Sequence, residues 1–224
     1  MISIAIDGPG GAGKSTLARR LAQELGYIYV DTGAMYRAIG LYALRAGVST
    51  KDCDCVAALL PQIRLELRYV EGAQVILLNG EDVSAAIRAE EVSMAASNVA
   101  VHSPVRAFLL QTQRDMAKAS NVLMDGRDIG TAVLPDATLK IYLTAPAEVR
   151  AARRVAQLAE KGTVAVFEEV LEDINRRDWQ DMHREIAPLR QAEDAVLVDT
   201  GALDLEQSFQ TLLNLIKEKV DSAV

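Results

Sequence analysis

The chain has 224 residues, of which 50% are hydrophobic, so it can bury a substantial core as one domain with insertions or as one domain with a small satellite. Its formal net charge of −7 argues against a broad surface for nucleic acid or anionic membranes, since those partners attract an excess of Lys and Arg. The chain starts on an apolar strand pattern without an export signal, and no apolar run approaches the roughly 20 residues that span a bilayer. We therefore expect a cytoplasmic protein. Cys53 and Cys55 are too close for an ordinary disulfide and too few for a zinc site.

The first apolar run, residues 2–7, predicts a strand, and the residues after it match the pattern G-x-x-x-x-G-K-[ST]. In such a loop, successive backbone N–H groups turn inward around a phosphate. Lys14 adds positive charge near the β- and γ-phosphates of a nucleotide, and the Ser15 hydroxyl is placed to bind Mg²⁺. The predicted phosphate-binding residues are Gly8, Pro9, Gly10, Gly11, Ala12, Gly13, Lys14, Ser15 and Thr16. The alternative is a glycine-rich turn that only connects two elements.

A helix follows this loop. Leu17, Ala18, Leu21, Ala22 and Leu25 recur at helical spacing, and Gly26 supplies a stop. The positive N-terminal end of the helix dipole would then face the bound anion. Strand, loop and helix together predict a P-loop that binds a nucleotide.

Further along the chain, short apolar runs alternate with stretches of helical periodicity. This alternation is typical of a parallel sheet with helices on both faces. The five predicted strands are residues 2–6, 27–30, 122–124, 139–143 and 195–198.

Four of these runs end on an acid, namely Asp7, Asp31, Asp125 and Asp199. The carboxyl ends of strands form the ligand crevice of open α/β sheets, so we expect these acids at the same edge as the P-loop. Asp31 and Asp125 are candidates for holding the waters of a bound Mg²⁺. The alternative is that they cap neighbouring helices.

Residues 63–83 break the alternation. Residues 63–69 alternate apolar and polar side chains, a break follows at 71–73, and a second apolar run ends in the Asn79-Gly80 turn. This pattern predicts a small antiparallel hairpin or three-stranded insertion.

A second break, residues 150–190, is rich in arginine. We call this segment the arm, and its arginines are Arg150, Arg153, Arg154, Arg176, Arg177, Arg184 and Arg190. We expect a mobile helical arm over the active site. The alternative is a solvated helical face on which arginines pair with Glu168, Glu169, Glu172 and Asp173.

A P-loop does not by itself determine the reaction, because switches, motors and kinases share it. The chain lacks an Asn-Lys-x-Asp motif for guanine, which argues against a signalling GTPase. Asp125 ends an apolar strand but is followed by Gly126, Arg127 and Asp128 rather than by the catalytic Glu of motor ATPases.

Five blocks, in this order and spacing, resemble the bacterial cytidylate kinase family. They are residues 6–14, 31–37, 80–84 and 125–130, and the late group Arg177, Asp181, Arg184 with Ala187-Pro188-Leu189. The resemblance extends from Ile4 to about Leu203.

The resemblance implies transfer of the γ-phosphoryl group of ATP to CMP or dCMP, with Mg²⁺ as the metal. It implies a P-loop NTPase fold with a five-stranded parallel sheet, formed as one kinase unit over residues 1–224. Residues 61–100 would be the enlarged nucleoside-monophosphate-binding insertion, and residues 150–190 the arginine-rich helical lid. We expect small-molecule substrates, no nucleic acid or membrane partner, and a monomer.

The resemblance also implies roles for individual residues. Arg37, Arg127 and Arg184 would contact the acceptor phosphate, and Arg177 would bridge donor and acceptor, since guanidinium groups match phosphate oxygens well. The expected catalytic residues are Lys14, Arg127, Arg177 and Arg184, and Ser15 is the expected metal ligand, although Thr16 offers a second hydroxyl. The expected substrate-binding residues are Thr32, Arg37, Ser97, Arg106, Arg127, Asp128, Arg177, Asp181 and Arg184.

Base recognition would fall to Ser97, Arg106 and Asp128, and Asp181 would hold the ribose hydroxyls. A carboxylate can accept a hydrogen bond from the cytosine amine, whereas it would face the corresponding carbonyl of uracil with repulsion. Two other functions stay open at this point. One is a kinase for another small acceptor, and the other is a regulatory module that hydrolyses ATP slowly.

Overall fold

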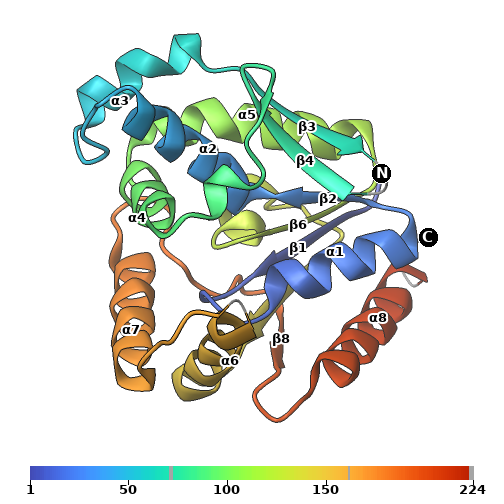
Figure 1. Ribbon diagram of the computed structural model, residues 1–224. Helices are drawn as coiled ribbons and strands as arrows, with labels where there is room; N and C mark the ends of the chain where they lie inside the picture. Colours follow the sequence, from blue (N-terminus) through green and yellow to red (C-terminus); the bar gives the residue numbers. More distant parts are fainter. Residues whose placement is uncertain (71–72, 161, 222–224) are drawn as a thin grey trace. The chain divides into compact units, whose positions relative to one another are not determined.

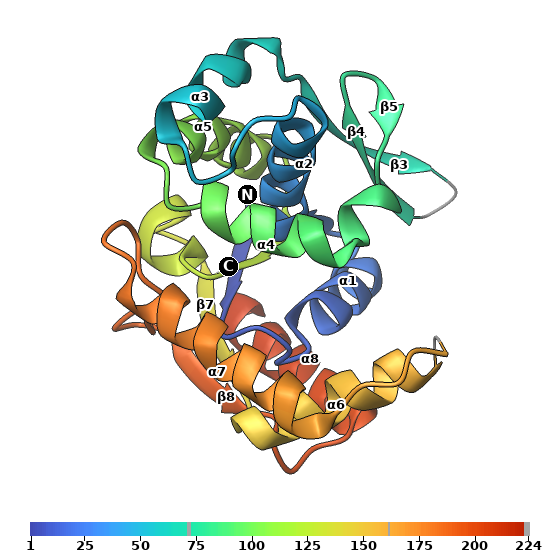
Figure 2. The same ribbon diagram turned by 60° about the vertical axis from the view of Figure 1, so that its left-hand side comes forward.

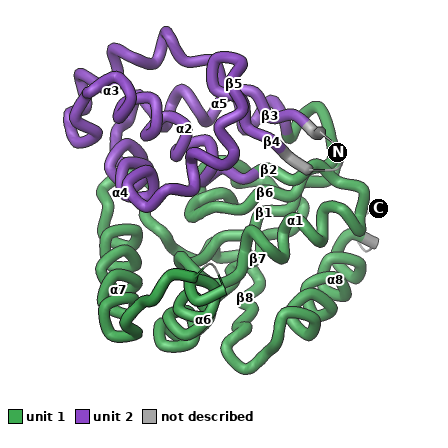
Figure 3. Tube along the Cα trace, viewed as in Figure 1, with its two compact units in different colours: residues 1–30, 117–224 green, residues 31–116 purple. Residues whose placement is uncertain are grey.

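The computed structural model describes residues 1–70, 73–160 and 162–221 (Figure 1). The chain divides into two compact units, which are residues 1–30 with 117–224, and residues 31–116 (Figure 3). The first unit contains the P-loop. The predicted break at 71–73 falls partly outside the described residues.

The first unit is built on a parallel sheet. Its strands are β1 (Ser3–Asp7), β2 (Ile28–Asp31), β6 (Val122–Gly126), β7 (Leu139–Thr144) and β8 (Val196–Asp199). They lie in the order β2-β6-β1-β7-β8, and β1 pairs in parallel with β6 on one side and β7 on the other. The five strands predicted from the apolar runs are confirmed.

The helices α1 (Lys14–Leu25) and α8 (Leu205–Asp221) lie side by side against one face of this sheet (Figure 1). The predicted helix after the P-loop is thus confirmed, and it ends at Gly26 in a left-handed conformation. The core beneath the two helices consists of side chains such as Ile4, Ile6, Leu17, Leu21, Leu123, Ile141, Leu212 and Ile216. This packing holds the N-terminal end of α1 beside the carboxyl end of β1.

Two helices form a pair after β7. These are α6 (Ala147–Glu160) and α7 (Phe167–His183), which pack against each other within the arm (Figure 2). A short π-helical turn, η3 (Ile129–Val133), follows β6.

The second unit contains helices and a small sheet. Its elements are α2 (Thr32–Arg45), α3 (Cys53–Leu59), η1 (Leu60–Gln62), β3 (Leu65–Val70), β4 (Ala73–Leu78), β5 (Glu81–Asp82), η2 (Ala86–Arg88), α4 (Glu90–Val99) and most of α5 (Ser103–Ala119). The strands β3, β4 and β5 form an antiparallel sheet in that order. Asn79 and Gly80 have φ angles of 51° and 87°, as a type I′ turn requires, so the predicted antiparallel piece is confirmed.

Within residues 1–70, 73–160 and 162–221, no helix is long and apolar enough to cross a membrane.

The helices α2 and α4 approach each other closely at Gly40. A Cβ placed on Gly40 would lie 3.0 Å from the Cβ of Ala95 and 3.0 Å from the backbone nitrogen of Ala96. Backbone atoms at this distance can move only if the helix moves, so the absence of a side chain sets the spacing of the two helices.

Replacement of Gly40 should therefore test this helix contact. We expect Gly40→Val to destabilise the protein by about 1–3 kcal/mol, because its methyl groups must push α4 away. Gly40→Ala should change stability less, since the gain in helix propensity partly offsets the tight contact. Urea denaturation of both variants measures the difference, and a Gly40→Val variant as stable as the wild type would contradict the close packing.

Candidate phosphate-binding site

The P-loop connects β1 to α1 and passes against the backbone of β7. At Gly8, where φ is 148°, a Cβ would lie 1.9 Å from the carbonyl oxygen of Leu143. No residue with a side chain fits there without displacement of the loop. The sheet itself therefore fixes the start of the loop.

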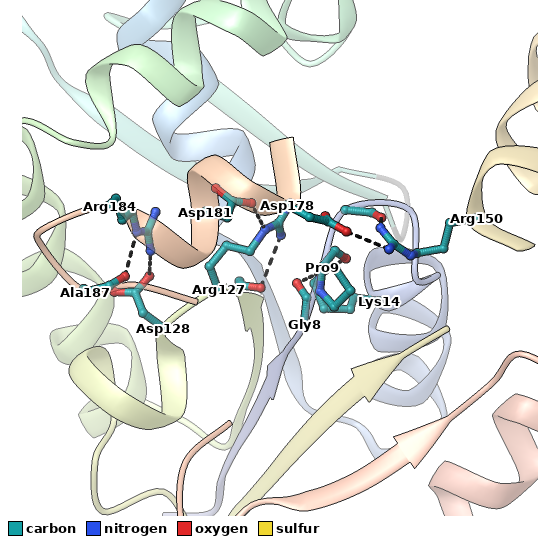
Figure 4. A network of polar contacts seen from close by, with 12 residues as sticks. Gly8, Pro9, Lys14, Arg127, Asp128, Arg150, Asp178, Asp181, Arg184 and Ala187 are labelled. Atoms are coloured by element: carbon teal, nitrogen blue, oxygen red, sulfur yellow. Dashed lines mark hydrogen bonds and ion pairs between the residues drawn. The ribbon is translucent and has the colours of Figure 1, made fainter. Parts of the chain in front are cut away.

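Lys14 holds the loop from within. Its Nζ donates hydrogen bonds to the carbonyl oxygens of Gly8 and Pro9, each at 2.7 Å (Figure 4). Burial lowers the pKa of Lys14, and the positive charge of Arg127 adds to this effect, while Asp125 and Asp7 oppose it. A bound phosphate would supply negative charge that favours the protonated amine.

Asp125 lies beside the metal-binding candidate. The Ser15 hydroxyl donates to Oδ2 of Asp125 at 2.8 Å, and the Tyr29 hydroxyl donates to Oδ1 at 2.8 Å. A hydroxyl and a carboxylate are the hard oxygen donors that Mg²⁺ prefers, and this ion usually keeps several waters and binds one or two carboxylates together with substrate phosphates. The residues therefore fit Mg²⁺. Among the described residues, no group of three or more His, Cys, Asp or Glu side chains could hold a metal alone.

The other three strand-end acids, Asp7, Asp31 and Asp199, accept hydrogen bonds from backbone N–H groups. Asp7 accepts hydrogen bonds from the N–H groups of Ile129 and Gly130, at 2.8 and 2.7 Å, and so ties β1 to η3. Burial raises its pKa to about 6, although these two donors act in the opposite direction. Asp31 accepts from the N–H of Ala34 at 2.9 Å and caps α2, which is the alternative considered for this residue.

Two ion pairs connect Arg127 and Asp128, which directly follow β6, to the C-terminal end of α7. Nε of Arg127 donates to Asp181 at 2.7 Å, and Nη2 of Arg184 donates to Asp128 at 3.0 Å. The side chains of Arg184 and Asp128 are each 8% exposed. Burial disfavours the charge on Arg127, but the Asp181 carboxylate, together with Asp125 and Asp178, outweighs this effect and raises the pKa of the guanidinium.

A strained turn holds Arg184 in place. Ala187 has a φ of 48°, which is uncommon for a residue with a side chain, and its carbonyl oxygen accepts from Nε of Arg184 at 2.7 Å. The following turn is closed by the Leu189 N–H, which donates to the Asp181 carbonyl at 2.8 Å. The Ala187-Pro188-Leu189 segment thus fixes the direction of the Arg184 side chain.

The structure adds two residues that sequence reasoning did not assign to the site. Arg150 donates to the Gly10 carbonyl of the P-loop at 2.9 Å and to Asp178 at 2.6 Å (Figure 4). The sequence contains one indication that Asp178 belongs to the site, because Asp178 lies three residues before Asp181 and therefore on the same face of α7. The partner of Asp178 could not be read from the sequence.

The predicted site residues fall into both units. Lys14, Arg127, Asp128, Asp181 and Arg184 lie together in the first unit, as Figure 4 shows. Arg177 also belongs to this unit and is exposed on α7. The substrate-binding candidates of the second unit are Thr32 and Arg37 in α2, Ser97 in α4 and Arg106 in α5.

The alternative interpretation of the arm, a solvated helical face with paired arginines, describes Arg176. Arg176 pairs with Asp173 at 2.7 Å, with both side chains 53% exposed, so this pair lies on the surface.

The cytidylate kinase family model matches residues 4–218. A protein of Caldicellulosiruptor saccharolyticus named cytidylate kinase is 49% identical over 223 residues, which cover 100% of this chain and 99% of the relative. Cytidylate kinases of Shouchella clausii and Geobacillus kaustophilus are each 46% identical, with 96% and 98% of this chain and of the respective relative covered.

Among solved structures, a shikimate kinase of Bacteroides thetaiotaomicron covers 98% of both chains at 15% identity, with a TM-score of 0.47, a value too low to bear on function. The family model and the relatives, in contrast, extend over nearly the whole chain. The chain belongs to the cytidylate kinase family and is a phosphotransferase.

Proposed function

We propose that this protein transfers the γ-phosphoryl group of ATP to CMP and dCMP. An oxygen of the acceptor phosphate attacks the γ-phosphorus in line, the bond to the β-γ bridging oxygen breaks, and ADP leaves with CDP or dCDP as the second product. Membership of the cytidylate kinase family supports the acceptor, and the P-loop supports the nucleotide donor.

The observation that carries this proposal is the group of cations at the P-loop and beside it. Lys14, Arg127 and Arg184 come from three separate segments of a chain whose net charge is −7, yet they lie along one row in the same unit (Figure 4). Phosphoryl transfer requires little covalent work and much electrostatic stabilisation, so a local group of cations suits it. Asp181 and Asp128 hold Arg127 and Arg184 in place, and the carbonyl oxygens of Gly8 and Pro9 hold Lys14.

We assign the donor phosphates to residues 8–16. Mg²⁺ would be held by Ser15, with Asp125 beside it, because the Ser15 hydroxyl already contacts that carboxylate. Thr16 suits this role less well, since it is exposed. The ion would neutralise charge on the β- and γ-phosphates.

The family resemblance assigns the residues that would bind the acceptor. Arg37, Arg127 and Arg184 would bind the acceptor phosphate, and Arg177 would bridge donor and acceptor. The base would contact Ser97, Arg106 and Asp128, the ribose would contact Asp181, and Thr32 would complete the substrate contacts. A phosphate dianion carries more charge than a carboxylate and offers more acceptor oxygens, so it can displace Asp181 from Arg127.

The proposal extends to the organisation of the chain. Residues 61–100 would serve as the insertion that binds the monophosphate, and residues 150–190 as a lid whose closure excludes water from the reacting phosphates. We also propose that the enzyme acts as a cytoplasmic monomer.

A coupled assay of ADP release, with and without CMP, tests this function. A CMP kinase releases ADP at a high rate only when CMP or dCMP is present. A regulatory nucleotide-binding module would release ADP slowly in both cases. A kinase for another acceptor would respond to a different nucleoside monophosphate or metabolite in the same assay.

The first prediction of this function concerns Lys14. We expect Lys14→Ala to lower kcat about 100-fold or more, because a cation beside the transferring group is lost. Circular dichroism should show an intact fold, and steady-state kinetics measures kcat. Turnover close to that of the wild type would remove Lys14 from the catalytic group.

The second prediction concerns base choice. Asp128→Asn should narrow the ratio of kcat/KM between CMP and UMP, mainly by lowering the value for CMP, because an amide can face either a donor or an acceptor. The amide oxygen can still accept from Arg184, so the fold should survive. An unchanged ratio would move base recognition to Ser97 and Arg106.

The third prediction separates the two roles of Arg184. Arg184→Ala leaves Asp128 buried without this partner, and we expect a loss of about 3–5 kcal/mol in stability together with a large fall in kcat/KM for CMP. The double variant Arg184→Ala with Asp128→Asn should recover most of the stability but not the activity. Recovery of both would mean that Arg184 acts only as the partner of Asp128.

A further inference from the structure

Arg150 is a buried arginine with three acceptors on three different segments. It lies in the first turn of α6, and 5% of the residue is exposed. Nε donates to the Ala145 carbonyl at 2.8 Å, Nη1 to the Gly10 carbonyl at 2.9 Å, and Nη2 to Asp178 at 2.6 Å (Figure 4). The guanidinium therefore joins the end of β7, the P-loop and α7.

The planar shape of the guanidinium makes this junction stiff. Its donors point in fixed directions within one plane, so the bond to Ala145 orients the two that reach Gly10 and Asp178. The Asp178 side chain is 13% exposed, and charge-assisted hydrogen bonds in such surroundings are roughly twice as strong as neutral ones. All three acceptors are protein atoms.

The bond to Gly10 orients a peptide group of the P-loop. In a trans peptide the C=O of one residue and the N–H of the next lie in one plane and point in opposite directions. Because Arg150 holds the Gly10 carbonyl, the N–H of Gly11 is directed away from Arg150. A phosphate cradle needs its N–H groups, and not its carbonyl groups, turned toward the anion.

The neighbouring carbonyls of the loop are held in a similar way. Lys14 binds the carbonyls of Gly8 and Pro9, so cations hold three consecutive carbonyl oxygens of the loop. The stem of Arg150 also lies against the loop at Gly11, where an added Cβ would lie 3.4 Å from the Cβ of Arg150.

We propose that Arg150 is a positioning residue that holds the P-loop in its phosphate-accepting conformation, and that Asp178 links this conformation to α7. This proposal takes the identity of the donor nucleotide, ATP, from the proposed function. Asp178 and Asp181 lie on the same face of α7 and bind Arg150 and Arg127, so a movement of α7 relative to both the sheet and the first turn of α6 must break both pairs. The position of α7 and the geometry of the loop are thereby coupled.

The test compares variants of this junction with matched controls on the same helices. Arg150→Met retains much of the stem and removes all the donors, Arg150→Lys retains the charge, and Asp178→Asn retains an acceptor without charge. The controls are Arg154→Met on α6, where Arg154 contacts the exposed Gln157, and Asp173→Asn on α7, where Asp173 binds the exposed Arg176. Calorimetry measures binding of MgADP, and steady-state kinetics measures KM for ATP, KM for CMP and kcat.

We expect Arg150→Met to weaken MgADP binding at least about tenfold, to raise KM for ATP similarly and to lower kcat, with KM for CMP changed much less. Arg150→Lys should lie between Arg150→Met and the wild type. Asp178→Asn should have a smaller effect of the same kind, and both controls should stay within about twofold. The effects of Arg150→Met and Asp178→Asn on MgADP binding should not add in free energy, because both act through one junction.

A purely structural role gives a different result. Arg150→Met would then lower the melting temperature, while MgADP binding and kcat measured well below that temperature would match the wild type, and the proposal would be overturned. If Arg150→Met fails to fold, Arg150→Lys and Asp178→Asn decide the question by the same readouts. Wild-type protein that binds MgADP but does not phosphorylate CMP would refute the proposed function only, because MgADP binding still tests the junction. Wild-type protein that does not bind MgADP would refute both.

Discussion

The phosphate-binding loop depends on one constraint, which is that its carbonyl groups must be held away from the anion while its N–H groups face it. Two cations meet this requirement, since Lys14 binds the carbonyls of Gly8 and Pro9, and Arg150 binds that of Gly10. The loop also touches the backbone of β7 at Gly8, where a Cβ would collide with the Leu143 carbonyl. The loop geometry therefore follows from the sheet beneath it and from the cations around it.

The same cations raise an electrostatic problem. Lys14 lies near Arg127, and Arg184 and Arg150 flank this pair (Figure 4). Isolated buried charges are unfavourable. Carboxylates on neighbouring segments solve this problem, because Asp181, Asp178 and Asp128 each bind one of the three arginines. The three arginines are thus held in place by carboxylates, and a phosphate that binds at the proposed site would have to compete with these carboxylates.

These pairs connect distant parts of the sequence. Arg127 and Asp128 follow β6, Arg150 lies in α6, and their partners lie on or beyond α7. Two of the three acids, Asp178 and Asp181, lie on one face of α7, so their positions depend on the position of this single helix. The cost of desolvating each charge is met by a partner at hydrogen-bond distance, which explains how an acidic chain keeps a local group of arginines.

The sequence by itself determined the fold class and the P-loop. Apolar runs at strand length, helical periodicity after Lys14 and the Asn79-Gly80 turn are local patterns, and they correspond to β1, α1 and the antiparallel sheet. It also singled out Lys14, Arg127, Asp128, Asp181 and Arg184, whose spacing matches a known family. Only the tertiary structure showed that Arg127 binds Asp181, that Arg184 binds Asp128, and that Arg150 joins Gly10 to Asp178. These pairs link residues 28 to 140 positions apart, and no local pattern encodes such pairing, because it depends on how strands and helices pack.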